Sequence, residues 1–327
     1  WWNSSPSDYT IVLQNYRHPQ KSYKLCSIRM RKVLIKILQA KPSMYLRNEL
    51  GNIIGAQFLY STLLYLHRVL RVPSPKKEAF KPLLKTLNEN GLVVLENFFS
   101  TEEHALIEKS YRSLESRFVT QQSSVPLPHV SALSIHSPQI DERVKKLFVG
   151  NPFFDEFATA FLNRKYHFPV QGFFMRIFCD QDEGKLPQNG GTNNIHFDVP
   201  ARTLKYFYYI TDTNEQNAAF TYYKGSQKRT LKRALFEYKK SIEYARNKHN
   251  PNHGGEYRDG EPWVKITDEE MQRLGFKESF ISGKANSLVI ANVGGFHRRG
   301  AFPKAGVRET VEINYRSIEM IRNDLYP

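Results

Sequence analysis

Two histidines and one aspartate constrain this chain more than any other feature of its sequence. His196 and Asp198 are two residues apart, and His297 lies about a hundred residues further along the 327-residue chain. Successive side chains of a strand point to opposite faces, so His196 and Asp198 point the same way if residues 195–199 are extended. Two imidazoles and one carboxylate are the facial ligand set of non-haem Fe(II) sites, which leave positions open for further ligands. We therefore expect a fold that brings His297 beside the His-x-Asp segment.

The surroundings of these residues favour a metal site over a chance pair. A histidine and an aspartate at this spacing also arise in loops, where the two side chains never meet a metal. Here His196 follows the polar, glycine-rich segment 189–194 and precedes an aromatic run at 204–210. His297 follows the apolar run 287–291. Both runs have strand composition, so the candidate ligands lie at the ends of expected strands.

Arg308, eleven residues after His297, opens a further strand-like stretch at 307–315. A guanidinium binds a carboxylate bidentately and stays charged, so this arginine is the candidate for holding an anionic cosubstrate. Strand alternation puts polar side chains on one face of the stretch and apolar side chains on the other. We expect the polar face to line the interior, with Thr310 adding a hydroxyl contact. That face consists of Arg308, Thr310, Glu312 and Asn314.

The order of these residues resembles the phytanoyl-CoA dioxygenase-like family of Fe(II)- and 2-oxoglutarate-dependent oxygenases. The resemblance covers roughly residues 80–320, and residues 1–79 have no counterpart in the family core. One departure is Gln227, where the family often has histidine; that position is not a metal ligand in the family. The resemblance rests on His-x-Asp at 196–198, Gly225-Ser226, His297, Arg308, and the run 83–103, which is typical of the helix, strand and helix start that open these domains.

The resemblance implies an α+β chain with a mainly β core, a double-stranded β-helix (jelly roll, cupin-like) flanked by helices. It implies that His196, Asp198 and His297 bind Fe(II) and that the enzyme uses 2-oxoglutarate and O2. The far carboxylate of 2-oxoglutarate would pair with Arg308. Asp198 favours hydroxylation over halogenation, because halogenases of this class lack that carboxylate.

The same resemblance names two further candidates for cosubstrate contacts. In the family the cosubstrate pocket draws on the strand before the first metal histidine, which here is residues 170–179. Gln171 and Arg176 are therefore secondary candidates.

The positive charge of the chain is concentrated at its N-terminal end. Residues 1–80 carry 13 of the 47 Lys and Arg residues but 3 of the 32 Asp and Glu residues, which gives +10 of the net +15. We interpret residues 1–79 as a basic helical extension and residues 80–327 as the oxygenase domain. Such an extension suits an anionic surface: membrane headgroups, nucleic acid or an acidic partner.

Two segments of the extension bear on membrane contact. Residues 24–41 predict a basic amphipathic helix, which either lies on a membrane or packs on the domain with a solvated basic face. Residues 51–67 carry no formal charge but are too short and too polar for a span, so we expect an interfacial or buried helix. Peripheral membrane contact through residues 24–71 and an otherwise cytoplasmic location follow as predictions. The two cysteines form no disulfide framework.

A second basic run, at 228–248, lies inside the domain. It is either a solvated helix face or a basic rim that attracts an anionic substrate. We expect a small-molecule, lipid or sugar-type substrate that is anionic. Two other functions compete: a nucleic-acid demethylase with the same ligands, which the location of the charge and the lack of a base-reading pattern disfavour, and a catalytically silent membrane-associated scaffold, which the complete ligand set disfavours.

The remaining pattern predicts the elements around the site. Loops are expected over 119–138, where three prolines occur. A hydroxyl cap at Ser100 followed by two glutamates predicts a helix start. Helices are expected at 80–90, 100–117, 141–149, 152–162 and 268–274, and strands at 92–98 and 170–179.

Overall fold

The computed structural model describes residues 49–59, 61–62, 78–121, 129–162, 171–180, 194–198, 202–247 and 266–315. The chain divides into two units, residues 1–42 and 43–327, and all described residues belong to the second. The helix predicted at 24–41 lies outside the described residues, as do the last five residues of the segment 51–67. No helix in the described part of the chain is long and apolar enough to cross a membrane.

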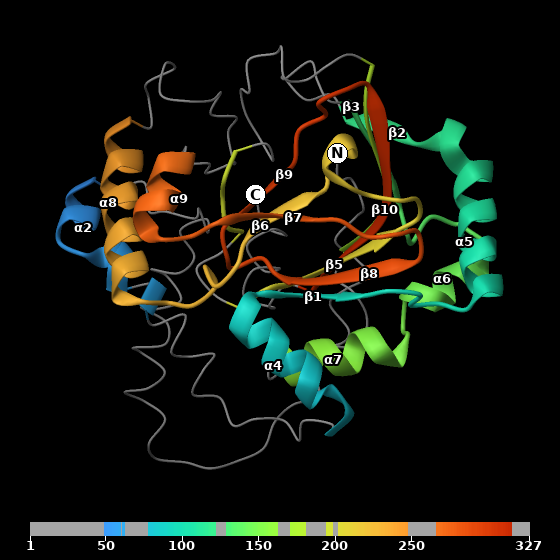
Figure 1. Cartoon of the computed structure of the whole chain (residues 1–327), viewed down its shortest axis with the longest axis horizontal. Coiled ribbons are helices and arrows are strands. Elements are labelled where there is room, and N and C mark those ends of the chain that lie inside the picture. The colour runs from blue at the N-terminus through green and yellow to red at the C-terminus, as the bar shows by residue number, and fades with distance from the viewer. Residues whose placement is uncertain are drawn as a thin grey trace, which may run out of the picture. The chain divides into compact units, whose positions relative to one another are not determined.

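A seven-stranded antiparallel sheet forms the centre of the second unit (Figure 1). Its strands are rich in aromatic and β-branched residues, which pack well on a pleated surface. The chain therefore has the mixed character, with an antiparallel sheet and flanking helices, that the sequence predicts. In spatial order the strands are β1 (Leu92–Leu95), β8 (Ser287–Asn292), β5 (Leu204–Tyr209), β10 (Gly306–Tyr315), β4 (Gln171–Cys179), β3 (His129–Ser134) and β2 (Val119–Gln121).

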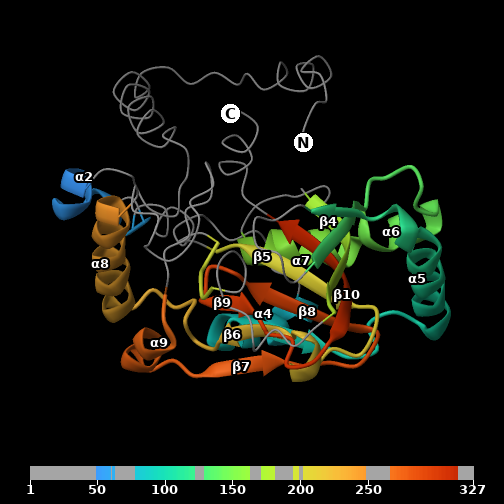
Figure 2. The ribbon, with the colours of Figure 1, turned by 90° about the horizontal axis from the view of Figure 1, so that it is seen from above.

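A second antiparallel sheet of three strands, in the order β7-β6-β9, packs on one face of the large sheet (Figure 2). The two sheets share an apolar cluster in which Phe207 of the large sheet stacks on Phe220 of the small one, with ring centroids 4.6 Å apart. We call this face of the large sheet the inner face. The small sheet consists of β7 (Glu278–Ile281), β6 (Phe220–Tyr223) and β9 (His297–Arg299).

Four helices cover the opposite, outer face of the large sheet. Their apolar sides share the largest buried cluster with outward-facing strand residues such as Phe174, Tyr206 and Val311. The sequence predicts all four. They are α4 (Lys81–Asn90), α5 (Thr101–Leu114), α6 (Glu142–Phe148) and α7 (Pro152–Leu162), with short 3-10 turns at Glu78–Phe80 and Glu115–Arg117.

Local sequence signals explain where two of these helices begin and end. The Ser100 side chain accepts from the Glu103 backbone N–H while the Glu103 carboxylate accepts from the Ser100 N–H, which is a capping box at the start of α5. Helix α4 ends at Gly91, whose φ of 87° is left-handed. A Cβ on Gly91 would also lie 2.3 Å from Tyr222 Oη, so glycine is needed there for space as well as for conformation.

The loops expected over 119–138 are one point at which the sequence interpretation is wrong. Within this range the structure forms β2 and β3, and β3 pairs with β4 from His129 opposite Phe178 to Ser134 opposite Phe173. β2 is the edge strand of the sheet and β3 lies between it and β4, so pairing with neighbouring strands rather than local composition specifies them. The short strands β6, β7 and β9 likewise had no separate sequence prediction.

Helix α8 (Leu231–Asn247) packs against residues that the sequence interpretation assigns to the basic extension. Helix α2 (Glu49–Ile53) lies beside it (Figure 1). Asn52 Nδ2 donates to the Ser241 carbonyl at 2.8 Å, and Tyr238 Oη donates to the Ile53 carbonyl at 2.6 Å. Residues 49–53 therefore pack with the unit that contains the site. A further helix, α9 (Asp268–Leu274), begins with a capping box at Thr267.

Candidate metal centre

A short backbone ladder brings the two candidate histidines together. The His196 N–H donates to the His297 carbonyl at 2.9 Å, and the His297 N–H donates to the His196 carbonyl at 2.8 Å. The Asp198 N–H donates to the Val293 carbonyl at 3.0 Å. The imidazole centroids are 4.3 Å apart. The convergence that the sequence predicts for residues a hundred positions apart is therefore present.

The three side chains present one donor atom each to a common point. His196 Nε2 and His297 Nε2 lie 3.7 and 3.4 Å from Asp198 Oδ1, and the three potential ligand atoms all lie within 4.8 Å of one another. His196 Nδ1 is 2.7 Å from the Asn194 carbonyl, and His297 Nδ1 is 2.9 Å from the Gly295 carbonyl. A carbonyl only accepts, so both Nδ1 atoms carry the proton and both Nε2 atoms offer a lone pair. This is the second-sphere arrangement of metal-binding histidines.

The charge states of the group also suit a divalent cation. Burial and the neighbouring His297 lower the pKa of His196 well below its ordinary value, so this imidazole is neutral. Burial by itself would raise the pKa of Asp198, but the Lys205 ammonium holds it well below its ordinary value. A neutral imidazole and an ionised carboxylate are the forms that bind metal.

Lys205 is a component of the site that the sequence interpretation missed. Its Nζ lies 3.0 Å from Asp198 Oδ2, and 18% of the lysine side chain is exposed. Lys205 is on β5 opposite Asn314 of β10, so it points to the inner face. The sequence did contain a signal for this lysine. Lys205, Phe207 and Tyr209 are spaced two residues apart in the run 204–210, so their side chains share one face of the strand.

Arg308 and Thr310 lie on the inner face, as strand alternation predicts. The Arg308 side chain is buried; its Nη1 donates to the Ala218 carbonyl at 2.6 Å and its Nη2 lies 3.6 Å from Glu312 Oε1. Burial lowers the pKa of Arg308. Arg308 Nε and Thr310 Oγ1 have no hydrogen-bond partner among the described residues. Buried polar atoms are normally satisfied, so these two atoms are suited to a ligand that supplies acceptors.

The structure separates the two secondary candidates from Arg308. Arg176 pairs in register with Glu309, so it lies on the outer face of the sheet, where its guanidinium forms an ion pair with Glu115. Gln171 does lie on the inner face, opposite Asn314, six residues along β10 from Arg308. At about 3.3 Å per residue that separation is roughly 20 Å along the strand.

The basic run 228–248 matches neither of the two interpretations in full, the solvated helix face or the basic rim that attracts a substrate. Several of its basic side chains are buried within the structure and neutralised by glutamates. Arg229 and Arg233 both pair with Glu237, and Lys240 Nζ lies 2.7 Å from Glu270 Oε1. The periodicity of a charge run does not show which of its members point inward.

An antiparallel fold with a buried His-Asp-His group is typical of Fe(II)- and 2-oxoglutarate-dependent oxygenases, and the chain is an enzyme of this class. The model of the phytanoyl-CoA dioxygenase (PhyH) family matches residues 87–267, more than half of the chain. The chain therefore belongs to this family, which confirms the resemblance inferred from its sequence, with iron and 2-oxoglutarate as cofactor and cosubstrate. The match includes His196 and Asp198 and ends before His297 and Arg308.

Solved structures similar to the chain include an epimerase, a carbocyclase and EctD. The epimerase SnoN in complex with Fe3+, alpha ketoglutarate and nogalamycin RO is 14% identical, with 76% of this chain and 90% of that chain covered and a TM-score of 0.49. The carbocyclase SnoK from nogalamycin biosynthesis is 15% identical, with coverages of 75% and 86% and a TM-score of 0.46. EctD from S. alaskensis is 14% identical, with coverages of 76% and 81% and a TM-score of 0.48. No curated protein matches the chain in sequence.

Proposed function

We propose that this chain is a hydroxylase that holds Fe(II) with His196, Asp198 and His297 and consumes 2-oxoglutarate and O2. The observation that carries the proposal is the convergence of three donor atoms within 4.8 Å, with both histidines fixed by carbonyls. The two facing sheets are then the two halves of a double-stranded β-helix, and the inner face of the large sheet lines its interior. Iron and 2-oxoglutarate supply the oxidising power for hydroxylation when bound.

Arg308 and Thr310 hold the far carboxylate of 2-oxoglutarate in this proposal. The guanidinium is buried and already fixed at one end by the Ala218 carbonyl, so little conformational freedom remains to be lost on binding. Its unpaired Nε and the Thr310 hydroxyl supply donors to the carboxylate. A charge-assisted bond of this kind is about twice as strong as a neutral one.

Lys205 positions the Asp198 carboxylate. Its ammonium faces Oδ2, while Oδ1 faces the two Nε2 atoms. The lysine therefore favours a carboxylate that offers Oδ1 alone and leaves other positions of the metal open. Because His196, His297 and Lys205 are largely shielded from solvent, water has limited access to the ligand atoms.

The charged side chains between the two sheets favour a small anionic substrate. They include three cations, and bound iron would add two further positive charges. The negative charges of Asp198, Glu312 and 2-oxoglutarate leave a positive excess, which favours an anionic group on the substrate. The cations are Lys205, Arg299 and Arg308.

The proposal is tested by measuring 2-oxoglutarate turnover without a substrate and with added candidate substrates. Purified protein with Fe(II), 2-oxoglutarate and O2 is screened against matched pairs of small molecules, each carboxylated or phosphorylated compound beside its neutral ester or alcohol. Succinate release and O2 uptake are measured together. We expect stimulation by anionic members of the pairs and a mass increase of one oxygen in the product. Release of succinate by His297→Ala at the wild-type rate would contradict the ligand assignment.

A further inference from the structure

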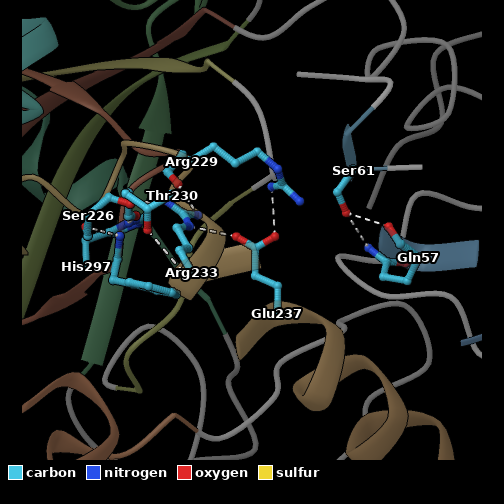
Figure 3. A network of polar contacts seen from close by, with 11 residues as sticks. Gln57, Ser61, Ser226, Arg229, Thr230, Arg233, Glu237 and His297 are labelled. Carbon is cyan, nitrogen blue, oxygen red and sulfur yellow. Dashed lines mark hydrogen bonds and ion pairs between the residues drawn. The ribbon is translucent and has the colours of Figure 1, made fainter. Parts of the chain in front are cut away.

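Arg233 of helix α8 lies near Ser226, Glu237 and His297 (Figure 3). Its contacts reach both ligand-bearing segments. Its side chain is 2% exposed. Nη2 donates to the Gly294 carbonyl at 2.7 Å, Nη1 donates to the Ser226 carbonyl, and Nε donates to Glu237 Oε1 at 2.7 Å. All three nitrogens of the guanidinium are therefore committed to fixed acceptors.

Two phenylalanines extend these contacts to the ligands themselves. The guanidinium carbon lies 5.1 Å from the ring centroid of Phe197 and 4.6 Å from that of Phe296. Phe197 stands between His196 and Asp198, and Phe296 immediately precedes His297. The two rings meet edge to face, with centroids 5.5 Å apart. One cation thus contacts the neighbours of all three ligands, within the range at which cations are attracted to aromatic rings.

The turn before His297 is held by the same group of residues. The Phe296 N–H donates to Ser226 Oγ at 2.8 Å, while Arg233 binds the Ser226 carbonyl. Arg233 also binds the carbonyl of Gly294, which adjoins the Gly295 carbonyl that fixes His297 Nδ1. The guanidinium therefore connects the segment 225–226, the turn 294–297 and the His-x-Asp segment.

Glu237 fixes the guanidinium in turn. Its carboxylate is buried, binds Arg233 through Oε1, and binds Arg229 Nη1 through Oε2 at 2.8 Å. Two arginines share one glutamate, so loss of Arg233 alone leaves a balanced Arg229–Glu237 pair. A variant at position 233 consequently does not leave the glutamate without a counter-charge, which favours its folding.

From these contacts we propose that Arg233 is a positioning residue of the metal centre, which holds the His196–Asp198 segment and the His297 turn at the separation that the ion requires. The inference rests on the proposed function. A planar fork is required, because a lysine ammonium cannot reach the two carbonyls and Glu237 while stacking on two rings. Outer partners of this kind typically change metal affinity by about 10- to 100-fold.

The test uses the full-length protein and Co(II) alone as the probe. Co(II) affinity is measured by calorimetry, and the visible d–d spectrum reports coordination geometry. The variants are Arg233→Met, which retains apolar volume, and Arg233→Lys, which retains the charge. Arg246→Met is the matched control, because Arg246 is on the same helix and its ion pair with Glu49 is exposed.

We expect both variants at position 233 to bind Co(II) about 10- to 100-fold more weakly with an altered spectrum, and Arg246→Met to match the wild type. If Arg233→Met does not fold, the measurement is made on Arg233→Lys. Wild-type affinity and spectrum in a folded variant, even with a lowered Tm, would overturn the inference, since a purely structural role changes only the Tm. Failure of the wild type to bind Co(II) would instead overturn the proposed function.

Discussion

Lys205 Nζ lies 3.0 Å from Asp198 Oδ2, on the side of the carboxylate that faces away from the two imidazoles. Aspartate and lysine are remote from bulk water here, with 10% and 18% of their side chains exposed. The Lys205 ammonium therefore balances the charge of the Asp198 carboxylate in the metal-free site. Because the lysine is not itself a ligand, its role can be tested apart from that of the three ligands.

Replacing Lys205 by Met should destabilise the metal-free protein by about 3–5 kcal/mol, because it leaves a buried carboxylate without its partner. Added Co(II) should restore part of this loss, since the ion replaces the missing positive charge. Thermal unfolding with and without Co(II) measures both effects. Lys284→Met is the control, as Lys284 makes an exposed ion pair with Asp212. Equal unfolding temperatures for Lys205→Met and the wild type without metal would contradict the prediction.

Arg308 and Arg176 should differ sharply in their effect on 2-oxoglutarate binding, because they lie on opposite faces of one sheet. A hydrogen bond to a charged group contributes about 1.5–3 kcal/mol. Arg308→Lys keeps the charge but loses the guanidinium fork, so it should raise the KM for 2-oxoglutarate by roughly 10- to 100-fold. Thr310→Val should raise it a few-fold. Arg176→Lys should leave the KM unchanged. A larger effect at Arg176 than at Arg308 would show that the carboxylate binds on the outer face of the sheet, which contradicts the prediction.

Acid should destabilise the metal-free protein through His196. The folded pKa of this imidazole is well below its ordinary value, owing to burial and to His297. The unfolded chain binds the proton below about pH 6.5 and the folded chain does not, so stability falls as pH drops below that value. Urea unfolding at pH 7.5 and 5.5 should show the difference, and His196→Gln should show less of it. An unchanged pH dependence in His196→Gln would be the contrary result.

Gly295 should tolerate no side chain. A Cβ there would lie 1.9 Å from Tyr222 Oη and 3.0 Å from Ser226 Oγ. The Gly295 carbonyl fixes His297, so Gly295→Ala should lower both the Tm and the affinity for Co(II). Gly150→Ala is the comparison: φ is 73° but no atom lies within 4 Å of its Cβ, so only conformational strain of about 1–2 kcal/mol is expected. Normal Co(II) binding by Gly295→Ala would show that the turn does not position the ligand.

The sequence predicts what depends on local chemistry and spacing. The capping signal at Ser100 and the left-handed Gly91 define helix ends that the structure reproduces. Alternation correctly places Arg308 and Thr310 on one face of β10, because face is a property of the strand itself. The ligand pattern was specific because His196 and Asp198 had to share a face.

What the sequence leaves open depends on which elements become neighbours. Nothing local to Arg176 shows that Glu115 of a preceding helical turn covers its face of the sheet. The burial of Arg233 depends on Phe197 and Phe296, which approach α8 only in the folded chain. Lys205 belonged to a run interpreted only as a strand, and its role appears only once Asp198 is placed beside it.

The most direct test of the whole account is an anaerobic titration of Fe(II) into the protein with saturating 2-oxoglutarate, followed by the weak visible charge-transfer absorption of the ternary complex. We predict one Fe(II) per wild-type chain and no band for His196→Ala, Asp198→Ala or His297→Ala, with a weakened band for Arg308→Ala. Absence of the band in folded wild-type protein, or its persistence when both imidazoles are removed, would contradict the assignment of the site.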